Sequence, residues 1–190
     1  MEGPLSGIRV LALENYLAGP MASMTMADLG ADVIKIEPPQ GDLSRMTLGP
    51  NHKGESSHFL SWNRDKRSVV LDLRTASGRE AFSDLVRISD VVLNNFRAGV
   101  MERLGLDYAV LKALNPKIVC VNITGMGPSG PYRDLPAVES TAAGISGILS
   151  VTGEPGGRPV RPGPAMSDLA NAMYATIATL IGAVPAISCR

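Results

Sequence analysis

The sequence predicts an α/β fold built on a doubly wound, mostly parallel sheet. Short apolar runs, typical of buried strands, alternate with segments of helical periodicity, and this alternation continues from residue 8 to residue 123. The chain has 190 residues, which suffices for one well-buried core but is short for two complete domains. Ligands of such sheets bind beyond the carboxyl ends of the strands, so the candidate site loops are 14–20, 37–45, 95–103 and 124–139.

The first unit of the pattern is strand, helix, strand. The apolar run 8–13 predicts a strand, and Ala18-Gly-Pro20 is a turn signal that leads into a helix over 21–29. Gly30 ends this helix, because glycine adopts the left-handed cap conformation without strain, and 32–36 forms the next buried strand. Strands joined through a helix in this way should lie parallel.

The rest of the sheet follows a long polar stretch. From Glu37 to about Asn63 the composition predicts a loop that covers a site. Beyond it we expect strands over 68–73, 90–94 and 117–123, and helices over 76–88, 100–104 and 107–114. After residue 124 Gly, Pro, Ser and Thr dominate, and the apolar patch 142–149 fits either a helix or a strand.

The last segment, from Leu169 to Cys189, carries no charged side chain and predicts a buried helix. Its expected buried face consists of apolar residues at steps of three or four: Leu169, Met173, Ile177, Leu180 and Val184. Asp168 precedes this run, where unpaired backbone N–H groups and the helix dipole should keep a carboxylate ionised. Residue types alone favour Ser167 or Asp168 as the N-cap of the helix over a catalytic role for Asp168.

Composition excludes several classes of function. Eighteen Lys and Arg balance eighteen Asp and Glu, so a general attraction to nucleic acid or to an anionic membrane is not expected. Asn171 and Pro185 argue against a membrane span in the uncharged segment, and the N-terminus shows no leader pattern, so we expect a cytoplasmic protein. A metal site is also not expected, because no metal-ligand spacing joins Cys120, Cys189, His52 and His58.

Familiar nucleotide and hydrolase motifs are missing. Glu37 stands at the end of the second strand, where a ribose-binding acid would lie, but the first loop lacks the G-x-G-x-x-G fingerprint of dinucleotide sites. The sequence also contains neither a P-loop nor a G-x-S-x-G elbow. Dinucleotide binding and serine hydrolysis therefore have little support.

Basic residues on the predicted ligand side suggest a phosphate-rich ligand. Each alone would be a solvated surface charge, but guanidinium groups that converge at one sheet edge match phosphate oxygens. The residues concerned are Arg45, Arg64, Lys66, Arg67, Arg74, Arg97 and Arg103. Asn95 and Phe96 could hold an adenine, although a Phe96 folded back onto the core is an equal alternative.

Seven motifs in order carry a resemblance that covers essentially the whole chain. They are Leu17-Ala-Gly-Pro20, the stretch 27–38, Gly41-Asp42 with Arg45, the stretch 63–68, Asn95-Phe96, Leu104-Gly105 and the stretch 161–168. This series resembles the class III CoA-transferases, the CaiB/BaiF family. The form of the sequence around Asp168 is most similar to members that act on dicarboxylates, and Leu17 stands where formyl-CoA transferases have Gln.

The resemblance implies a function and a set of site residues. Asp168 would be the nucleophile that carries CoA between an acyl-CoA donor and a carboxylic acid acceptor. The resemblance implies succinyl-CoA and a dicarboxylate as the substrates. The CoA thioester is a substrate, and no tightly bound cofactor is expected. The family contacts with CoA carry over onto Leu17, Ala18, Arg74, Asn95, Phe96, Arg97 and Arg103.

The resemblance also implies what this chain would lack. Residues 1–190 correspond to the N-terminal portion of the large CoA-binding domain, and the smaller domain, the C-terminal return and the interlocked homodimer would need more chain. We therefore expect a fragment or a truncated product. Two alternatives stay open: an inactive CoA-binding remnant, and a CoA-thioester racemase. Val138 disfavours the racemase, because such enzymes resemble one another in having a histidine there, just before the acid that matches Glu139.

Overall fold

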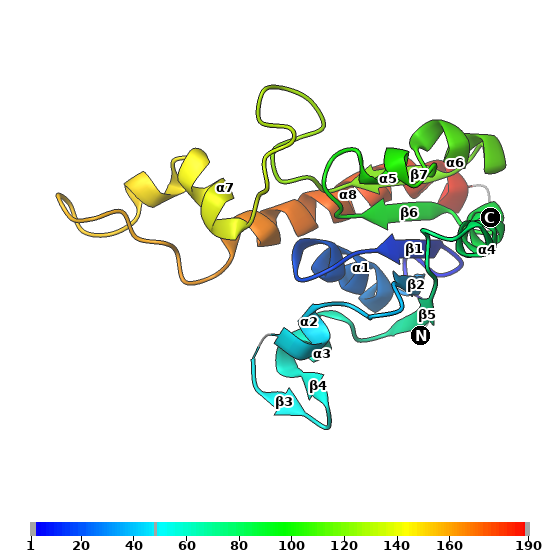
Figure 1. The fold of residues 1–190 in the computed structure, drawn as a ribbon, viewed down its shortest axis with the longest axis horizontal. Helices are drawn as coiled ribbons and strands as arrows, with labels where there is room; N and C mark the ends of the chain where they lie inside the picture. Colours follow the sequence, from blue (N-terminus) through cyan, green and yellow to red (C-terminus); the bar gives the residue numbers. More distant parts are fainter. Residues whose placement is uncertain (1–2, 48, 189–190) are drawn as a thin grey trace.

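The computed structural model describes residues 3–47 and 49–188, which form a sheet with helices on both faces (Figure 1). Five parallel strands run in the order β5-β2-β1-β6-β7, which confirms the predicted α/β fold. Their bounds are β1 (Arg9–Leu13), β2 (Asp32–Glu37), β5 (Lys66–Val70), β6 (Val91–Asn94) and β7 (Val119–Asn122). Strand β5 begins two residues and ends three residues before the predicted range 68–73.

The central strand β1 is buried on both sides. Its register places Val10 beside Val33 of β2 and beside Val91 of β6. Because successive side chains of a strand point to opposite faces, Val10 packs in one core cluster while Leu11 packs in the other. The strand therefore reads as a continuous apolar run, as buried parallel strands do.

Two helical layers complete these clusters. One face of the sheet is covered by α1 (Ala18–Asp28) and α8 (Met166–Ser188), and the opposite face by α4 (Ala76–Arg87), α5 (Val100–Arg103) and α6 (Tyr108–Leu114). Helix α1 starts three residues earlier than predicted, with Pro20 in its first turn. As predicted, Gly30 takes a left-handed conformation (φ +97°) after α1. At the start of α6, the Asp107 carboxylate caps the helix.

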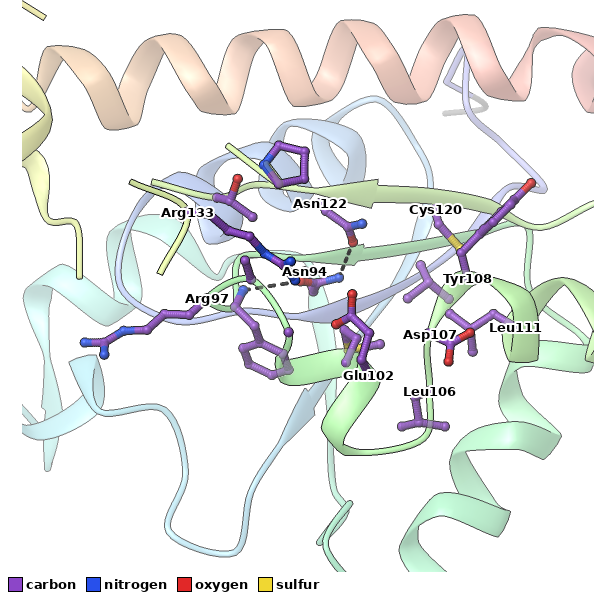
Figure 2. Close-up of a pocket in the computed structure, with 17 residues that line it drawn as sticks. Asn94, Arg97, Glu102, Leu106, Asp107, Tyr108, Leu111, Cys120, Asn122 and Arg133 are labelled. Atoms are coloured by element: carbon purple, nitrogen blue, oxygen red, sulfur yellow. Dashed lines mark hydrogen bonds between the residues drawn. The ribbon is translucent and has the colours of Figure 1, made fainter. Parts of the chain in front are cut away.

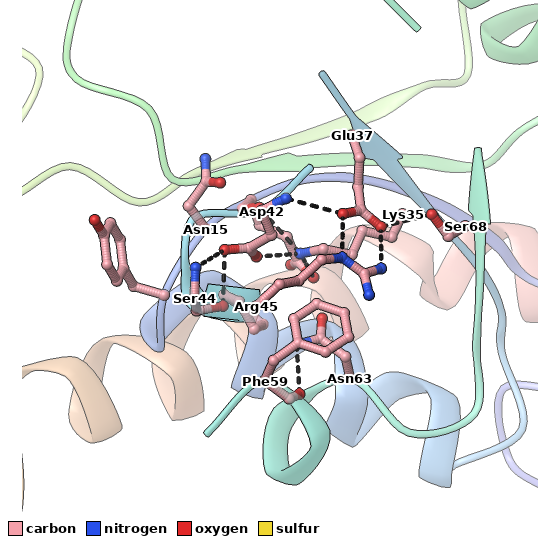
Figure 3. Close-up of polar contacts among 12 residues, drawn as sticks. Asn15, Lys35, Glu37, Asp42, Ser44, Arg45, Phe59, Asn63 and Ser68 are labelled. Carbon is pink, nitrogen blue, oxygen red and sulfur yellow. Dashed lines mark hydrogen bonds and ion pairs between the residues drawn. The ribbon is translucent and has the colours of Figure 1, made fainter. Parts of the chain in front are cut away.

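The segment between β2 and β5 is not the loop that its polar composition predicted. It contains α2 (Ser44–Thr47), a hairpin of β3 (Asn51–His52) and β4 (Glu55–Ser56), and α3 (Ser57–Trp62). Arg45 anchors it, with its guanidinium carbon 3.8 Å from the centre of the Phe59 ring and two hydrogen bonds to Glu37 (Figure 3). A sequence pattern could not show this, because a charged residue provides the packing.

A second excursion follows β7. It contains α7 (Glu139–Ile145) and a 3-10 turn, η1 (Ile148–Val151), so the apolar patch 142–149 is helical. In Figure 1 this part, drawn in yellow, projects well beyond the end of the sheet before the chain returns into α8.

Helix α8 was predicted correctly as a helix, but its predicted buried face is wrong at Met173 and Ile177, and of that face Leu180 packs against the core. The buried side consists of small residues, Ala172, Ala175, Thr176, Thr179 and Ala183. Small side chains permit the close contact of α8 with α1, whereas Met173 and Ile177 of the predicted face are 60% and 48% exposed. The predictions for Cys189 and for the Val184 side chain lie outside the described residues. None of the described helices is long and apolar enough to traverse a lipid bilayer.

Candidate functional site

The loops after β1 and β6 meet where the strand order reverses, which is where open α/β sheets bind ligands. The Asn15 backbone N–H donates to Asn95 Oδ1 (2.9 Å), and Asn95 Nδ2 donates to the Asn15 carbonyl (2.7 Å). Two of the predicted site residues, Leu17 at the N-cap of α1 and the buried Ala18, follow directly. The structure therefore brings Leu17, Ala18 and Asn95 to one place.

Buried charged side chains hold the loop after β1 in place. Glu14 accepts hydrogen bonds from Ser23 Oγ (2.8 Å) and from Lys66 Nζ (2.7 Å). Lys35 Nζ donates to the Glu14 carbonyl (3.0 Å) and pairs with Asp42 Oδ2 (2.8 Å). Burial lowers the pKa of Lys66 to about 8, against the opposing effect of Glu14. Lys66 is thus an internal structural cation and not the surface charge that the sequence suggested.

Glu37 is likewise occupied within the fold. Arg45 binds both of its carboxylate oxygens, at 2.7 and 2.8 Å, and Ser68 Oγ donates to Oε1 at 2.6 Å (Figure 3). Burial opposes ionisation, but the hydrogen bonds from Arg45, from Ser68 and from the Asp42 N–H outweigh it and lower the pKa of Glu37 to about 2. Glu37 is not free to bind a ribose, and Arg45 is not free to bind phosphate.

Three more of the predicted basic residues are paired with acids. Arg64 pairs with Asp28, and Arg67 with Asp32. Arg74 binds both oxygens of Asp72, each at 2.9 Å, beyond the end of the edge strand β5. The structure does not bring Arg74 to the loops after β1 and β6, because β2 lies between β5 and β1.

A pocket of about 130 Å³ opens beside the carboxyl ends of β6 and β7, against α5 and α6 (Figure 2). Phe96 and Arg97, both predicted as site residues, line it. Phe96 also packs against the core, as one of the two interpretations of this ring expected, while its contact with an adenine stays a prediction. At the pocket floor, Asn94 Nδ2 donates to Asn122 Oδ1 (2.5 Å), and the Phe96 N–H donates to Asn94 Oδ1 (3.3 Å).

Arginines without acidic partners lie at this pocket and beside it. Gly99 (φ +80°) has no side chain, and a Cβ atom there would lie 3.0 Å from Arg103 Nη1 and 3.9 Å from Arg133 Nη2. Among the described residues, neither of these arginines nor Arg97 forms an ion pair. Figure 2 shows Arg133 reaching toward Asn94, while the Arg97 side chain points away from the pocket. The sequence interpretation missed Arg133, which only the long loop after β7 brings to this place.

Asp168 is the third residue of α8 and is half-buried. Burial raises the pKa of its carboxyl group, the charge of Glu139 raises that pKa further, and His58 lowers it. The expected stabilisation by the helix end is absent, since the N–H groups of Ser167 and Asp168 donate to Glu139 instead (3.2 and 3.0 Å). The predicted N-cap role of Ser167 or Asp168 is therefore wrong, because the helix begins at Met166 and Glu139 caps it from α7.

His58 links Asp168 to the rest of the site. This histidine, on α3, acts electrostatically on Asp168, and its Nε2 atom lies 3.3 Å from the Tyr16 carbonyl oxygen. Tyr16 has a left-handed backbone (φ +64°) and belongs to the loop that Asn95 holds on its other side. The loop after β1 therefore contacts His58 on one side and Asn95, next to the pocket residue Phe96, on the other. No sequence signal connected His58 or Glu139 with Asp168, because both lie far from it along the chain.

Metal ligands and a reactive thiol have no geometric support at this site. Across residues 3–47 and 49–188, no three His, Cys, Asp or Glu side chains converge as a metal site requires. Cys120 lines the pocket, but burial raises the pKa of its thiol to about 11, so it stays protonated near neutrality.

Comparison with known proteins identifies relatives along nearly the whole chain. The family model described as CoA-transferase family III matches residues 5–186. The succinate–glutarate CoA-transferase of Agrobacterium fabrum is 43% identical over 182 residues, which are 92% of this chain and 46% of that protein. The human succinyl-CoA:glutarate CoA-transferase is 38% identical and is covered to 42%. The chain thus spans less than half the length of these two relatives.

A solved structure has the same fold. The chain superposes on a CaiB/BaiF family protein from Brucella suis with a TM-score of 0.93 and 40% sequence identity, covering 100% of this chain and 51% of that one. This similarity shows that the two proteins share one fold over the matched part.

Proposed function

Since the chain belongs to CoA-transferase family III, we propose that the protein transfers CoA from an acyl-CoA donor to a carboxylic acid acceptor, with Asp168 as the covalent nucleophile. The observation that supports this most directly is the half-buried Asp168 carboxylate, which accepts no hydrogen bond from any described residue although it lies at a helix end. A carboxylate with free lone pairs and a raised pKa is suited to nucleophilic attack.

The proposed reaction has four steps. A carboxylate oxygen of Asp168 attacks the thioester carbonyl, and the C–S bond breaks to give an aspartyl anhydride and the CoA thiolate. The thiolate attacks the Asp168 carbonyl carbon and displaces the donor carboxylate, which leaves an aspartyl-CoA thioester. The acceptor carboxylate attacks that thioester to form a second anhydride and thiolate. Attack of the thiolate on the acceptor carbonyl then releases the new acyl-CoA and regenerates the Asp168 carboxylate.

CoA itself would lie over the loops after β1 and β6. Arg97, Arg103 and Arg133 offer guanidinium groups that no described carboxylate neutralises, and such groups bind phosphates through paired hydrogen bonds. Leu17 and Ala18 would contact the CoA arm beside Asn95, and Phe96 its adenine. Arg74 could take part only by leaving Asp72, which makes it the weakest member of the proposed set.

For the acyl group we propose dicarboxylates such as succinate. The support is the identity of 43% with a relative whose name specifies succinate and glutarate. We further propose that residues 1–190 are the N-terminal portion of the large domain and that the whole protein is an interlocked homodimer. The outward face of α8 supports this proposal. Its apolar residues Met173, Tyr174 and Ile181 are 60%, 72% and 70% exposed, and further protein packed on this face would bury them.

Intact mass after mixing with succinyl-CoA tests the nucleophile. The complete gene product that contains this chain should gain the mass of CoA, less water, on Asp168, and hydroxylamine should remove it. Asp168→Ala should gain nothing, whereas the exposed Asp134→Ala should react like the wild type. Binding of CoA without any covalent adduct would refute the transferase and favour a CoA-binding remnant.

A further inference from the structure

The carboxylate of Glu139 caps helix α8 from another helix. Its Oε1 accepts the Ser167 N–H (3.2 Å) and its Oε2 accepts the Asp168 N–H (3.0 Å). Helix ends leave such N–H groups unsatisfied, and a side chain at the start of the same helix usually accepts them. Here the acceptor is the first residue of α7, so the cap joins the projecting segment after β7 to the helix that carries Asp168.

This arrangement leaves the Asp168 side chain unengaged. In a capping box, a Glu or Gln side chain at the third helical position accepts the backbone N–H of the N-cap residue and is thereby held at the helix end. Glu139 has taken the neighbouring N–H groups, and no described residue donates a hydrogen bond to the Asp168 carboxylate. The helix end thus fixes the backbone of Asp168 without occupying its lone pairs.

We propose that Glu139 is a positioning residue for the reacting carboxylate: it holds the Asp168 backbone while keeping the Asp168 carboxylate free of hydrogen bonds and beside a like charge. This inference rests on the proposed role of Asp168 as the nucleophile. It assigns a function to a side chain that contacts neither the pocket nor any of the predicted CoA contacts.

The charges around Asp168 define how the effect can be measured. In the described part of the chain, the ionisable side chains that act on it are Glu139 on α7 and His58 on α3. Burial and then Glu139 raise the pKa of Asp168, and His58 opposes them. Removal of the Glu139 charge must therefore lower the pKa of Asp168, so that the carboxylate persists to lower pH and is a weaker nucleophile where it is fully ionised.

The test is the rate of the succinyl-CoA-dependent mass gain on Asp168 as a function of pH, in the complete gene product. Glu139→Gln retains an oxygen acceptor but no charge. The acidic limb of its pH–rate profile should shift to lower pH, and the maximal rate at high pH should fall. Glu139→Ala should show the same shift and a further loss at every pH, because the cap is gone. Glu154→Gln, an exposed carboxylate in the same excursion, should follow the wild type.

Two results distinguish a failure of the positioning role of Glu139 from a failure of Asp168 as the nucleophile. If the wild type acquires no mass on Asp168, the proposed nucleophile is refuted and this inference with it. If the wild type reacts and the acidic limb of Glu139→Gln coincides with that of the wild type, the nucleophile stands and Glu139 has only a structural role. The wild type and Glu139→Gln are also compared with His58→Gln present in both. The shift of the acidic limb must persist there, because a shift that needs His58 would not come from Asp168.

Discussion

Gly19 lies so close to Asn95 that a Cβ atom at position 19 would be 3.0 Å from Asn95 Cγ. The same atom would lie 2.8 Å from the Cβ of Glu14, so the first turn of α1 sits between the two loops of the candidate site. Gly19 has an ordinary helical backbone, so the absence of a side chain here serves close packing and not conformational freedom. This contact couples the geometry of the loop after β1 to that of the loop after β6.

Gly19→Ala should therefore destabilise the protein and weaken CoA binding. Overpacking of a closed site costs about 1–3 kcal/mol, and the added methyl group must displace the side chain of either Asn95 or Glu14. Urea unfolding and CoA titration measure the two effects. Gly144→Ala on α7 is the matched control, because its Cβ would meet Leu149 Cδ1 at an ordinary 3.8 Å. Equal behaviour of the two variants would contradict the proposed close packing.

Asn95→Asp should weaken CoA binding more than it weakens the fold. The aspartate can still accept the Asn15 N–H, but it cannot donate to the Asn15 carbonyl and places a negative charge beside the expected phosphates. Loss of a buried hydrogen-bond partner costs about 1–3 kcal/mol, which corresponds to roughly 5–150-fold in affinity. Calorimetric titration with CoA checks this. Asn171→Asp, exposed on α8, should leave the affinity unchanged.

Arg133→Ala and Arg103→Ala should each weaken CoA binding by roughly tenfold or more, since a hydrogen bond to a charged group contributes about 1.5–3 kcal/mol. Both variants should also reduce the salt dependence of the dissociation constant. Arg64→Ala is the control: it removes an equally exposed guanidinium that is paired with Asp28. If all three variants bind CoA alike, the phosphates lie elsewhere.

The ion pair of Glu37 with Arg45 predicts a loss of stability in acid. The pKa of Glu37 is about 2 in the folded protein and about 4.5 in the unfolded chain, so the unfolded state takes up the proton first as the pH falls. The contribution, on the order of 3 kcal/mol, is complete above pH 4.5 and disappears as the pH approaches 2. Unfolding free energies from pH 6 to pH 2.5 should decline less for Glu37→Gln than for the wild type. Glu80→Gln, exposed on α4, should decline like the wild type.

Sequence reasoning worked where local pattern and burial agree. The strands of the sheet and the helices that flank it were predictable because their signals are local. Apolar runs form the strands, Gly30 ends α1 and Asp107 caps α6. It failed where a tertiary contact decides the outcome. The segment between β2 and β5 folds around Arg45, and α8 turns its small residues inward because α1 lies so close. Periodicity ranks large apolar residues first and cannot detect a contact that requires small ones.

The candidate site divides in the same way. The order of motifs in the sequence by itself determined the family, the position of Asp168 and the candidate ligand loops, because these follow from residue identity and from the direction of parallel strands. Only the tertiary structure decided which charges remain free. It neutralised Arg45, Arg64, Lys66, Arg67 and Arg74 with acids, left Arg103 and Arg133 together, and set Glu139 and His58 beside Asp168. Coulombic pairing depends on distance in space, and the chain order does not contain that distance.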